Sequence, residues 1–454
     1  MGRLFGTDGV RGVANAPPLT PELAYRLGRV TAALLAERRA GAGRPGLLVG
    51  RDTRLSGPLL EAALLAGIMS SGVDGLTVGV LPTPGIACLT RRLGAIGGAV
   101  ISASHNPFED NGIKFFSADG GKLPDAWEEE VETRLAEEAG LPRPTGAAIG
   151  RLRPVRSAEA LYLDAVRAAF PATLDLGGLR LVLDCAHGAT YRVAPRLFRG
   201  LGAEVVTVGA RPNGTNINAR CGALHPEGLQ ARVRAEGAHL GLAFDGDGDR
   251  LITVDEAGEV RDGDYLLALL GRHLHAEGLL RGGCVVTTAM ANLGLDRALT
   301  EVGIRAVRTQ VGDRYVLEEM HRLGANLGGE QSGHLIFLDH APTGDGLISA
   351  LQLLRVMRLR GASLGELSRC LTKFPQVLVN VPVRAKPPLA SLPRLSAAVR
   401  EWEARLGDAG RILLRYSGTE PLARIMVEGE ERTTIETVAG ELASVLRAEM
   451  EEAR

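Results

Sequence analysis

The chain has 454 residues, of which 45% are hydrophobic and 23% charged, and its 52 basic and 53 acidic residues give a formal net charge of −1. This is the composition of a globular protein, and the length predicts about three domains of roughly 150 residues, or four smaller ones. The balanced charge argues against a general affinity for nucleic acid or for an anionic membrane, but it allows a locally basic pocket for a small anion.

Targeting and cysteine signals favour a cytoplasmic protein. No apolar run approaches the length of a membrane-spanning helix, and the first residues lack the apolar stretch of a signal peptide. The five cysteines lie far apart in the sequence and form no CxxC pair, so we expect reduced thiols.

Three segments of the chain repeat one pattern of predicted elements. Each begins with a short apolar strand, at 47–49, 181–183 and 284–286. A helical stretch follows, and then a glycine and a second strand, at 72–78, 202–208 and 303–307. A further helical stretch leads to the sequence Gly-Ala-x-x-Gly, at 94–98, 237–241 and 324–328. Short strands separated by helical patterns predict three related α/β domains with mixed, largely parallel sheets.

The last part of the chain has a different order. It is predicted to form a smaller α+β domain, with strands at 376–383, 411–415 and 424–428 and helices at 392–406 and 433–451. Earlier boundaries are a Pro/Gly-rich stretch at 141–146, after a charged helix at 127–139, and a hairpin over 251–260. The predicted domains are therefore 1–150, 151–254, 255–370 and 371–454.

A polar loop follows the strand after each Gly-Ala-x-x-Gly sequence. These loops are 102–107, 245–250 and 329–334, and each carries a different set of side chains. Ligands of open α/β sheets bind at the carboxyl ends of strands, so the loops would meet if the domains face a common cleft.

The second loop alternates Asp245, Asp247 and Asp249 with glycines. Three carboxylates this close repel one another unless a cation neutralises them, and hard oxygen ligands in this number suit Mg²⁺ or Ca²⁺. A solvated acidic turn is the alternative. An EF-hand is rejected, although Glu256 falls at the twelfth position, because Arg250 occupies the sixth, where glycine is required.

The first loop contains Ser104, followed by His105 in a turn of small residues. A serine here can act as a nucleophile or phosphate carrier, but taken alone it is better explained as a turn or helix-cap residue. Lys114 lies ten residues later and is one of only four lysines in the chain. It is a surface lysine or, beside a phosphate and a metal ion, a group that moves protons.

The third loop alternates Glu330, Ser332 and His334, a set that suits sugar hydroxyls or forms an ordinary polar turn. In the last domain, Arg415 and Arg424 flank a Ser-Gly-Thr turn at 417–419. Backbone amides of such a turn bind anions and arginine adds bidentate phosphate contacts, which favours a phosphate site over a hairpin with incidental arginines.

Five segments together resemble the α-D-phosphohexomutase superfamily along essentially the whole chain. They are FGTDGVRG (5–12), SASHNP (102–107), DGDGDR (245–250), GEQSGH (329–334) and RYSGTEP (415–421). Further features resemble the branch of the superfamily that acts on amino-sugar phosphates, namely 50–54, 216–218, 221–222, 225–227 and Gln331.

The resemblance implies four domains around a deep central cleft and assigns roles to residues. Ser104 would be the phosphoserine residue and would bind one Mg²⁺ per chain with Asp245, Asp247 and Asp249. Arg11 and Lys114 would lie beside the phosphoserine, with Lys114 a candidate proton shuttle. Two further groups would contact the substrate. They are Glu330 and Ser332 with His334 nearby at the sugar, and Arg415, Ser417, Gly418, Thr419 and Arg424 at the phosphate that is not transferred.

The implied reaction interconverts the 6-phosphate and 1-phosphate of glucosamine through a bound hexosamine 1,6-bisphosphate, and would supply amino-sugar nucleotides for cell-wall precursors. The partners implied are small sugar phosphates and a second copy of the chain in a homodimer. Two alternatives remain: a mutase for phosphoglucose or phosphomannose, and a non-catalytic sugar-phosphate binder. Three positions depart from the common pattern: Val10 replaces Ile, Ala223 replaces Ser, and Tyr416 replaces a Lys beside the phosphate turn.

Overall fold

A computed structural model describes residues 4–6, 9–39, 43–137, 140–141, 143–417 and 421–452. The chain divides into two compact units. The first comprises Met1–Met290 and Ala306–Arg369, and the second comprises Ala291–Arg305 and Cys370–Arg454. Among the described residues, no helix combines the length and the apolar character needed to cross a membrane.

The first sheet of the first unit has the strand order β1-β5-β4-β2-β3-β6. Its strands are β1 (Val10–Val13), β2 (Gly46–Arg51), β3 (Asp74–Val80), β4 (Gly97–Ile101), β5 (Asp110–Ser117) and β6 (Leu152–Pro154). Its helices are α1 (Pro21–Glu37), α2 (Gly57–Ser70), α3 (Thr83–Arg92) and α4 (Asp125–Ala136). Helices α1 and α2 can pack closely because Gly28 has no Cβ; an added Cβ there would collide with the backbone oxygen of Leu64.

The second sheet has the order β11-β10-β9-β7-β8. Its strands are β7 (Arg180–Asp184), β8 (Glu204–Val208), β9 (Leu240–Phe244), β10 (Leu251–Val254) and β11 (Val260–Arg261). The helices of this region are α5 (Ala158–Arg167), α6 (Val193–Gly200) and α7 (Glu227–Glu236). The hairpin predicted over 251–260 is present as the antiparallel pair β10–β11.

The third sheet has the order β13-β12-β14-β15. Its strands are β12 (Cys284–Thr288), β13 (Arg305–Thr309), β14 (Leu327–Gly329) and β15 (Leu335–Phe337). The helices of this region are α8 (Gly263–Ala276), α10 (Asp313–Leu323), α11 (Gly346–Arg360) and α12 (Leu364–Leu367). Short 3₁₀ turns occupy Gly146–Ala148 and Arg281–Gly283 in this unit, and a third, Ser368–Cys370, ends at the first residue of the C-terminal segment of the second unit.

One strand arrangement occurs in all three sheets and confirms the predicted repeat. In each sheet a central strand pairs in parallel with an earlier strand, as β4 does with β2, β9 with β7 and β14 with β12. The same strand then turns back into an antiparallel partner, which is β5, β10 and β15 respectively. The three polar loops of the sequence are the turns of these hairpins, so equivalent positions carry different side chains.

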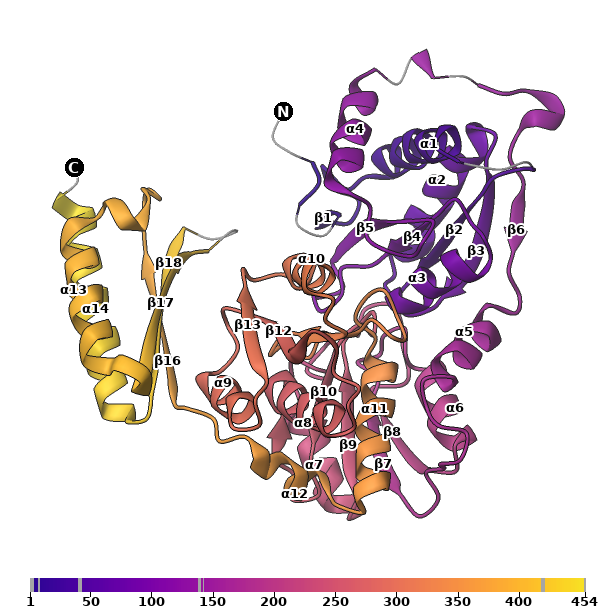
Figure 1. Ribbon diagram of the computed structural model, residues 1–454. Helices are drawn as coiled ribbons and strands as arrows, with labels where there is room; N and C mark the ends of the chain where they lie inside the picture. Colours follow the sequence, from indigo (N-terminus) through magenta and orange to yellow (C-terminus); the bar gives the residue numbers. More distant parts are fainter. Residues whose placement is uncertain are drawn as a thin grey trace. The chain divides into compact units, whose positions relative to one another are not determined.

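The second unit contains the predicted smaller α+β domain. An antiparallel sheet of order β16-β18-β17 is formed by β16 (Gln376–Pro382), β18 (Leu422–Gly429) and β17 (Gly410–Tyr416). It packs with α13 (Pro393–Leu406) and α14 (Arg432–Glu452), which lie side by side at the end of the chain (Figure 1). Further 3₁₀ turns are Leu389–Ser391 and Gly407–Ala409.

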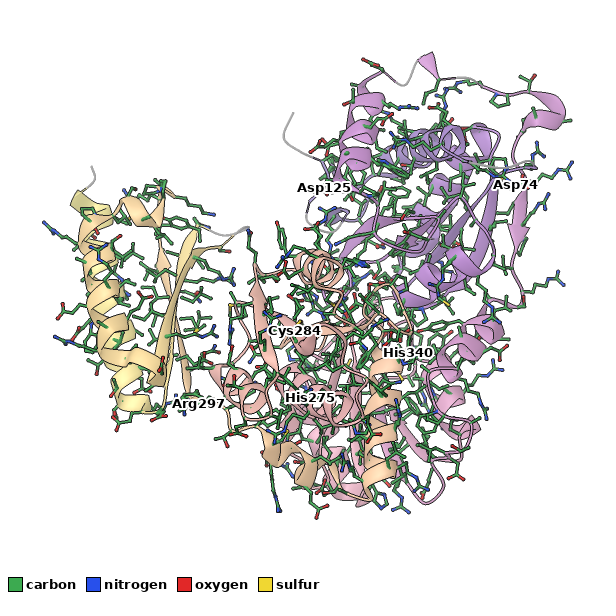
Figure 2. All side chains as sticks on the ribbon, viewed as in Figure 1. Asp74, Asp125, His275, Cys284, Arg297 and His340 are labelled. Carbon is green, nitrogen blue, oxygen red and sulfur yellow. The ribbon has the colours of Figure 1, made fainter. Side chains whose placement is uncertain are left out.

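Helix α9 (Leu293–Thr300) belongs to the second unit although it follows β12 in the chain. The Asn292 side chain donates to the Phe374 oxygen and accepts from the Phe374 nitrogen, at 3.0 and 2.9 Å. Arg297, labelled in Figure 2, lies 4.4 Å from the centre of the Phe374 ring and pairs with Glu430 at 2.8 Å.

Candidate active site

Ser104 lies in the turn between β4 and β5, with 3% of its surface exposed and a φ of 51°. Its backbone N–H donates to Ser102 Oγ at 2.9 Å, and the Ser102 hydroxyl donates to Asp52 Oδ2 at 2.6 Å. Ser104 Oγ donates to Asp245 Oδ2 at 2.6 Å. Since 141 residues separate these two partners, the fold brings together the serine loop of the first repeat and the acidic loop of the second.

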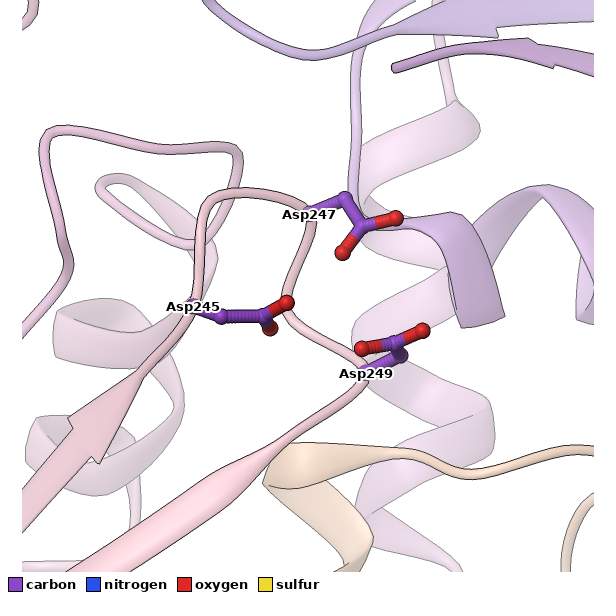
Figure 3. A group of neighbouring side chains, drawn as sticks. All are labelled: Asp245, Asp247 and Asp249. Atoms are coloured by element: carbon purple, nitrogen blue, oxygen red, sulfur yellow. The ribbon is translucent and has the colours of Figure 1, made fainter. Parts of the chain in front are cut away.

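Asp245, Asp247 and Asp249 converge in the turn between β9 and β10 (Figure 3). Each offers one carboxylate oxygen, and these oxygens lie within 4.8 Å of one another. All three residues are buried, and Oδ1 of Asp247 and Oδ1 of Asp249 have no hydrogen-bond partner among the described residues. Orphaned buried carboxylate oxygens are costly unless a cation neutralises them, so this donor set fits a hard divalent ion such as Mg²⁺.

Burial and the negative charges of this cluster both shift the pKa of Asp245. Burial raises the pKa of this carboxyl well above its ordinary value, and the neighbouring charges of Asp249 and Asp247 raise it further. Two groups on other elements contact Asp247: the Thr83 hydroxyl donates to its Oδ2 at 2.7 Å, and Lys114 Nζ lies 3.4 Å from the same oxygen. Lys114 is therefore buried beside the acidic loop and is not a surface lysine.

Arg11 lies beside the serine loop, and His105 belongs to it. Arg11 is on β1, opposite Gly112 of β5. His105 Nδ1 lies 3.4 Å from Ser104 Oγ. Burial lowers the pKa of His105 to about 4, together with the positive charges of Arg250 and Arg11, so this imidazole is neutral near pH 7. Thr7 and Asp8 of the N-terminal motif lie outside the described residues.

The third loop, 329–334, joins the acidic loop through the backbone and through His334. The Leu251 N–H donates to the Gly333 oxygen at 3.0 Å. His334 Nδ1 lies 3.5 Å from Asp249 Oδ2. Burial would lower the pKa of His334, but the hydrogen bond and charge of Asp249 outweigh it and raise the pKa to about 9, so the ring is cationic.

Two polar side-chain atoms of the same loop make no hydrogen bond to the described part of the protein. Ser332 Oγ and His334 Nε2 are buried and have no hydrogen-bond partner within the described part of the chain. Glu330 Oε1 accepts from the Gly312 N–H at 3.2 Å, which fixes the carboxylate near the start of α10. This combination of a fixed carboxylate and unpartnered donors suits a ligand rich in hydroxyl groups.

A pocket of about 380 Å³ opens beside this centre, and Thr83, Lys114 and Asp249 form part of its wall. Asp125, labelled in Figure 2, and Asp313 line it farther out. Lys122 pairs with Asp313 at 3.3 Å across the pocket, and Arg314 pairs with Asp125. The volume is within the usual range for a small-molecule site.

The second unit carries the arginines predicted at the phosphate turn. Arg415 on β17 and Arg424 on β18 are direct cross-strand neighbours. Burial and the charge of Arg424 lower the pKa of Arg415. Ser417 is buried at the end of β17, whereas Gly418 and Thr419 lie outside the described residues.

Tyr416 and Lys386 determine the charge next to this turn, where Tyr416 stands in place of the expected Lys. The Tyr416 hydroxyl donates to the Pro387 oxygen at 2.7 Å, and Lys386 Nζ donates to the Ser417 oxygen at 2.5 Å. Tyr416 thus supplies no charge where the resemblance leads us to expect Lys, but Lys386 brings an ammonium group to the same turn from another loop.

Arg250 is a residue that the sequence analysis did not assign to the site. It follows Asp249, and its Nε is buried without a hydrogen-bond partner in the regions that the structure describes. Burial would lower its pKa, but the charges of Asp245, Asp249 and Glu330 raise it. Its position directly after the three aspartates of the DGDGDR segment could have indicated this role, because a buried cluster of acidic groups needs a nearby cation.

Comparisons with known families cover nearly the whole chain. Four models of the phosphoglucomutase/phosphomannomutase family match: alpha/beta/alpha domain I at residues 2–140, domain II at 160–258, domain III at 262–374 and the C-terminal domain at 378–445. Phosphoglucosamine mutase of Moorella thermoacetica is 55% identical over 447 residues, which cover 98% of this chain and 99% of that protein. The enzyme of the same name from Syntrophotalea carbinolica is 52% identical, with 98% and 97% covered.

Solved structures show the same fold. A phosphoglucomutase/phosphomannomutase family protein of Burkholderia thailandensis matches with a TM-score of 0.80 and 26% identity, covering 98% of this chain and 97% of the other. N-acetylphosphoglucosamine mutase of Aspergillus fumigatus, solved with GlcNAc-6P and magnesium, matches with a TM-score of 0.66 and 18% identity, covering 98% and 96%. At this lower identity the likeness concerns the fold alone.

Proposed function

Because the chain belongs to the phosphoglucomutase/phosphomannomutase family, we propose that it interconverts glucosamine 6-phosphate and glucosamine 1-phosphate. The substrate is taken from relatives that are 52% and 55% identical and carry the name phosphoglucosamine mutase. The observation that carries the chemistry is the 2.6 Å contact between Ser104 Oγ and Asp245, at the edge of an incompletely satisfied carboxylate cluster.

Ser104 is the proposed phosphate carrier. Its hydroxyl is buried beside a cluster of acidic groups and two nearby cations, Lys114 and Arg250. A phosphoserine adds about −1.5 to −2 charges at neutral pH, so the site must supply compensating positive charge. Asp245, Asp247 and Asp249 with Ser104 would hold one Mg²⁺ per chain, which supplies charge that offsets the phosphoryl group in the transition state.

Phosphoryl transfer begins with phosphorylated Ser104 and a hexosamine monophosphate. The O1 or O6 hydroxyl of the sugar attacks phosphorus, the bond between phosphorus and Ser104 Oγ breaks, and the hydroxyl proton of the sugar is transferred to Ser104 Oγ. Lys114 is the proposed shuttle for that proton, and Arg11 is proposed to contact the phosphoserine. The product is a hexosamine 1,6-bisphosphate, which turns around and returns its other phosphate to Ser104.

The remaining assigned residues orient the substrate. Glu330 and Ser332 are proposed to hold sugar hydroxyls, with His334 beside them, and the unpartnered atoms of this loop support that role. The second unit contributes the proposed groups for the phosphate that is not transferred, namely Arg415, Ser417, Gly418, Thr419 and Arg424. Under this proposal, each of the four domains 1–150, 151–254, 255–370 and 371–454 would supply one loop to the reaction.

Phosphorus NMR tests the reaction and its substrate together. The protein is incubated with Mg²⁺, a trace of hexose 1,6-bisphosphate and glucosamine 6-phosphate, with glucose 6-phosphate and mannose 6-phosphate in parallel. A glucosamine 1-phosphate signal that grows much faster than the other two products is expected. A faster glucose or mannose reaction would overturn the substrate, and binding without interconversion of any sugar would overturn the enzymatic proposal.

A further inference from the structure

Two side chains outside the assigned site hold the backbone of the serine loop. Arg54 Nη2 donates to the carbonyl oxygens of Ser104 and Asn106, at 2.9 Å each. Asn218 Nδ2 donates to the same two oxygens, also at 2.9 Å each. Two donor nitrogens and two acceptor oxygens therefore form a closed set of four hydrogen bonds, which we call the loop clamp.

Most hydrogen-bond donors of Arg54 are used by the serine loop. Its side chain is fully buried, and its Nε pairs with Asp52 Oδ2 at 2.8 Å. Its remaining donor, Nη1, reaches the oxygens of Asp110, at 3.0 Å, and Pro107. A buried guanidinium is tolerated only where its donors are satisfied, and here most of them bond to carbonyl groups of a single turn.

Asn218 reaches the serine loop from the second repeat. Its own backbone has a φ of 58°, and its N–H donates to the Ala186 oxygen at 2.9 Å. Gly246 of the acidic loop packs on the same atoms: an added Cβ there would lie 2.6 Å from the Ser104 oxygen and 2.8 Å from Asn218 Nδ2. The loop clamp therefore lies where the serine loop, the acidic loop and the Asn218 segment meet.

We propose that Arg54 and Asn218 are positioning residues for phosphoryl transfer, because the loop clamp fixes the carbonyl groups on either side of His105 and holds Ser104 in its left-handed conformation. Residues other than glycine adopt such a conformation only when their surroundings impose it. In this conformation Ser104 Oγ meets Asp245 at 2.6 Å. Phosphoryl transfer depends mainly on alignment, and a misplacement of about 1 Å costs on the order of 100-fold in rate.

Asn218→Ala tests the inference, with Asn216→Ala as the matched control. Asn216 lies in the same segment, but its side chain bonds to Arg211 and Asn213 and makes none of the loop-clamp contacts. For Asn218→Ala we expect kcat to fall about 10- to 100-fold while KM for the sugar phosphate changes less than about threefold. Asn216→Ala should keep kcat near the wild-type value, and the two variants should unfold at similar temperatures.

Variants of Arg54 provide a second, independent test of the inference. Arg54→Lys retains one charged donor and should recover part of the activity that Arg54→Met loses, in a single-turnover measurement of transfer from phosphorylated Ser104. Hydrogen exchange adds a readout that needs no substrate: the backbone amides of Ser104, His105 and Asn106 should exchange about tenfold faster in Asn218→Ala than in Asn216→Ala.

The inference rests on the proposed function, and its failure is separable from the failure of that function. A wild-type protein that turns over none of the three sugars would overturn the proposed function, whatever the variants do. Normal wild-type turnover with an unchanged kcat in Asn218→Ala would overturn the inference. Equal effects of Asn218→Ala and Asn216→Ala, on kcat or on exchange, would also overturn it.

Discussion

The serine loop (102–107) and the loop 329–334, called the sugar loop after its proposed role, occupy equivalent turns, between β4 and β5 and between β14 and β15, but their serine hydroxyls differ in whether they bond to protein. In the serine loop the Ser102 hydroxyl bonds to Asp52, and the Ser104 and Asn106 oxygens bond to Arg54 and Asn218. In the sugar loop Ser332 Oγ and His334 Nε2 are buried without a partner in the described regions of the molecule. A loop whose groups bond to protein is fixed in place, whereas unpartnered groups are available to a ligand.

The acidic loop contains both kinds of polar group, those bonded to protein and those without a partner. Asp245 is bonded to Ser104, while one oxygen each of Asp247 and Asp249 has no hydrogen-bond partner among the described residues. The side of the loop that faces the serine is thus fixed, and the other atoms are available to a cation. The contrast predicts that removing the Ser102 hydroxyl, which bonds to protein, affects stability and catalysis together, whereas removing the unpartnered Ser332 hydroxyl affects catalysis alone.

The largest effect is expected for Ser104→Ala, which removes the phosphate carrier. Turnover should fall at least about 10⁴-fold, because no other hydroxyl replaces the nucleophile. The measurement is the conversion of glucosamine 6-phosphate followed by phosphorus NMR, with the unfolding temperature as the control for folding. Turnover above about 1% of the wild-type rate would contradict the assignment of Ser104 as the carrier.

In the sugar loop, Ser332→Ala should lower kcat/KM about tenfold, with little change in the free energy of unfolding. The buried hydroxyl has no partner within the described residues, so its removal leaves no new unsatisfied group. Ser102→Ala is the matched variant in the serine loop. It deprives Asp52 and the Ser104 N–H of a partner, so it should cost about 1–3 kcal/mol of stability as well as activity.

Steady-state kinetics and urea unfolding of both variants check this contrast. Equal losses of free energy of unfolding in Ser332→Ala and Ser102→Ala would contradict the proposed difference between the bonded and the unpartnered hydroxyl.

Gly246→Ala tests how tightly the acidic and serine loops pack. The added Cβ would lie 2.6 Å from the Ser104 oxygen, so one of the two loops must move, at a cost of about 1–3 kcal/mol. Gly228→Ala in α7 is the control, since no atom lies within 4 Å of its added Cβ, and it should be neutral or stabilising. Equal free energies of unfolding for the two variants would show that the loops are not in close contact.

An effect that appears only when the pH is varied is expected at Asp345, a buried carboxyl that caps α11 and accepts a hydrogen bond from Tyr162 at 2.9 Å. Burial raises its pKa to about 6, although bonds from Ile348, Tyr162 and Leu347 oppose the shift. Since the unfolded pKa is about 3.9, this group stabilises the fold below about pH 4, and that contribution is lost as the pH rises through about 6.

Asp345→Asn keeps the cap and removes the titration. Its free energy of unfolding relative to wild type should therefore increase by the order of 2 kcal/mol between pH 4 and pH 7. Urea unfolding at several pH values measures this difference. A difference that stays constant with pH would contradict the raised pKa.

Sequence patterns predicted the elements and the chemistry-bearing loops, because both depend on local order. Short apolar strands between helical patterns located the repeat, and the predicted helix at 433–451 is observed as α14 at Arg432–Glu452. The alternation of aspartate with glycine also sufficed to predict a cluster of carboxylates. These are features of neighbouring residues, and neighbouring residues are what a single sequence displays.

Contacts across long sequence separations could not be predicted in this way. Thr83 bonds to Asp247 across 164 residues, and Asn218 bonds to Ser104 across 114 residues. Nothing in the local sequence of Thr83 or Asn218 indicates which distant residue its side chain will contact. Their roles follow from the packing of whole elements, which a sequence pattern does not specify.

The membership of α9 in the second unit bears on how the chain can be divided. The chain passes from one unit to the other after Met290, after Arg305 and after Arg369. A fragment that begins at Cys370 would lack α9 and leave the Phe374 backbone without the Asn292 side chain. An exchange of the C-terminal segment between relatives would therefore have to match helix α9, about 70 residues upstream, to keep these contacts.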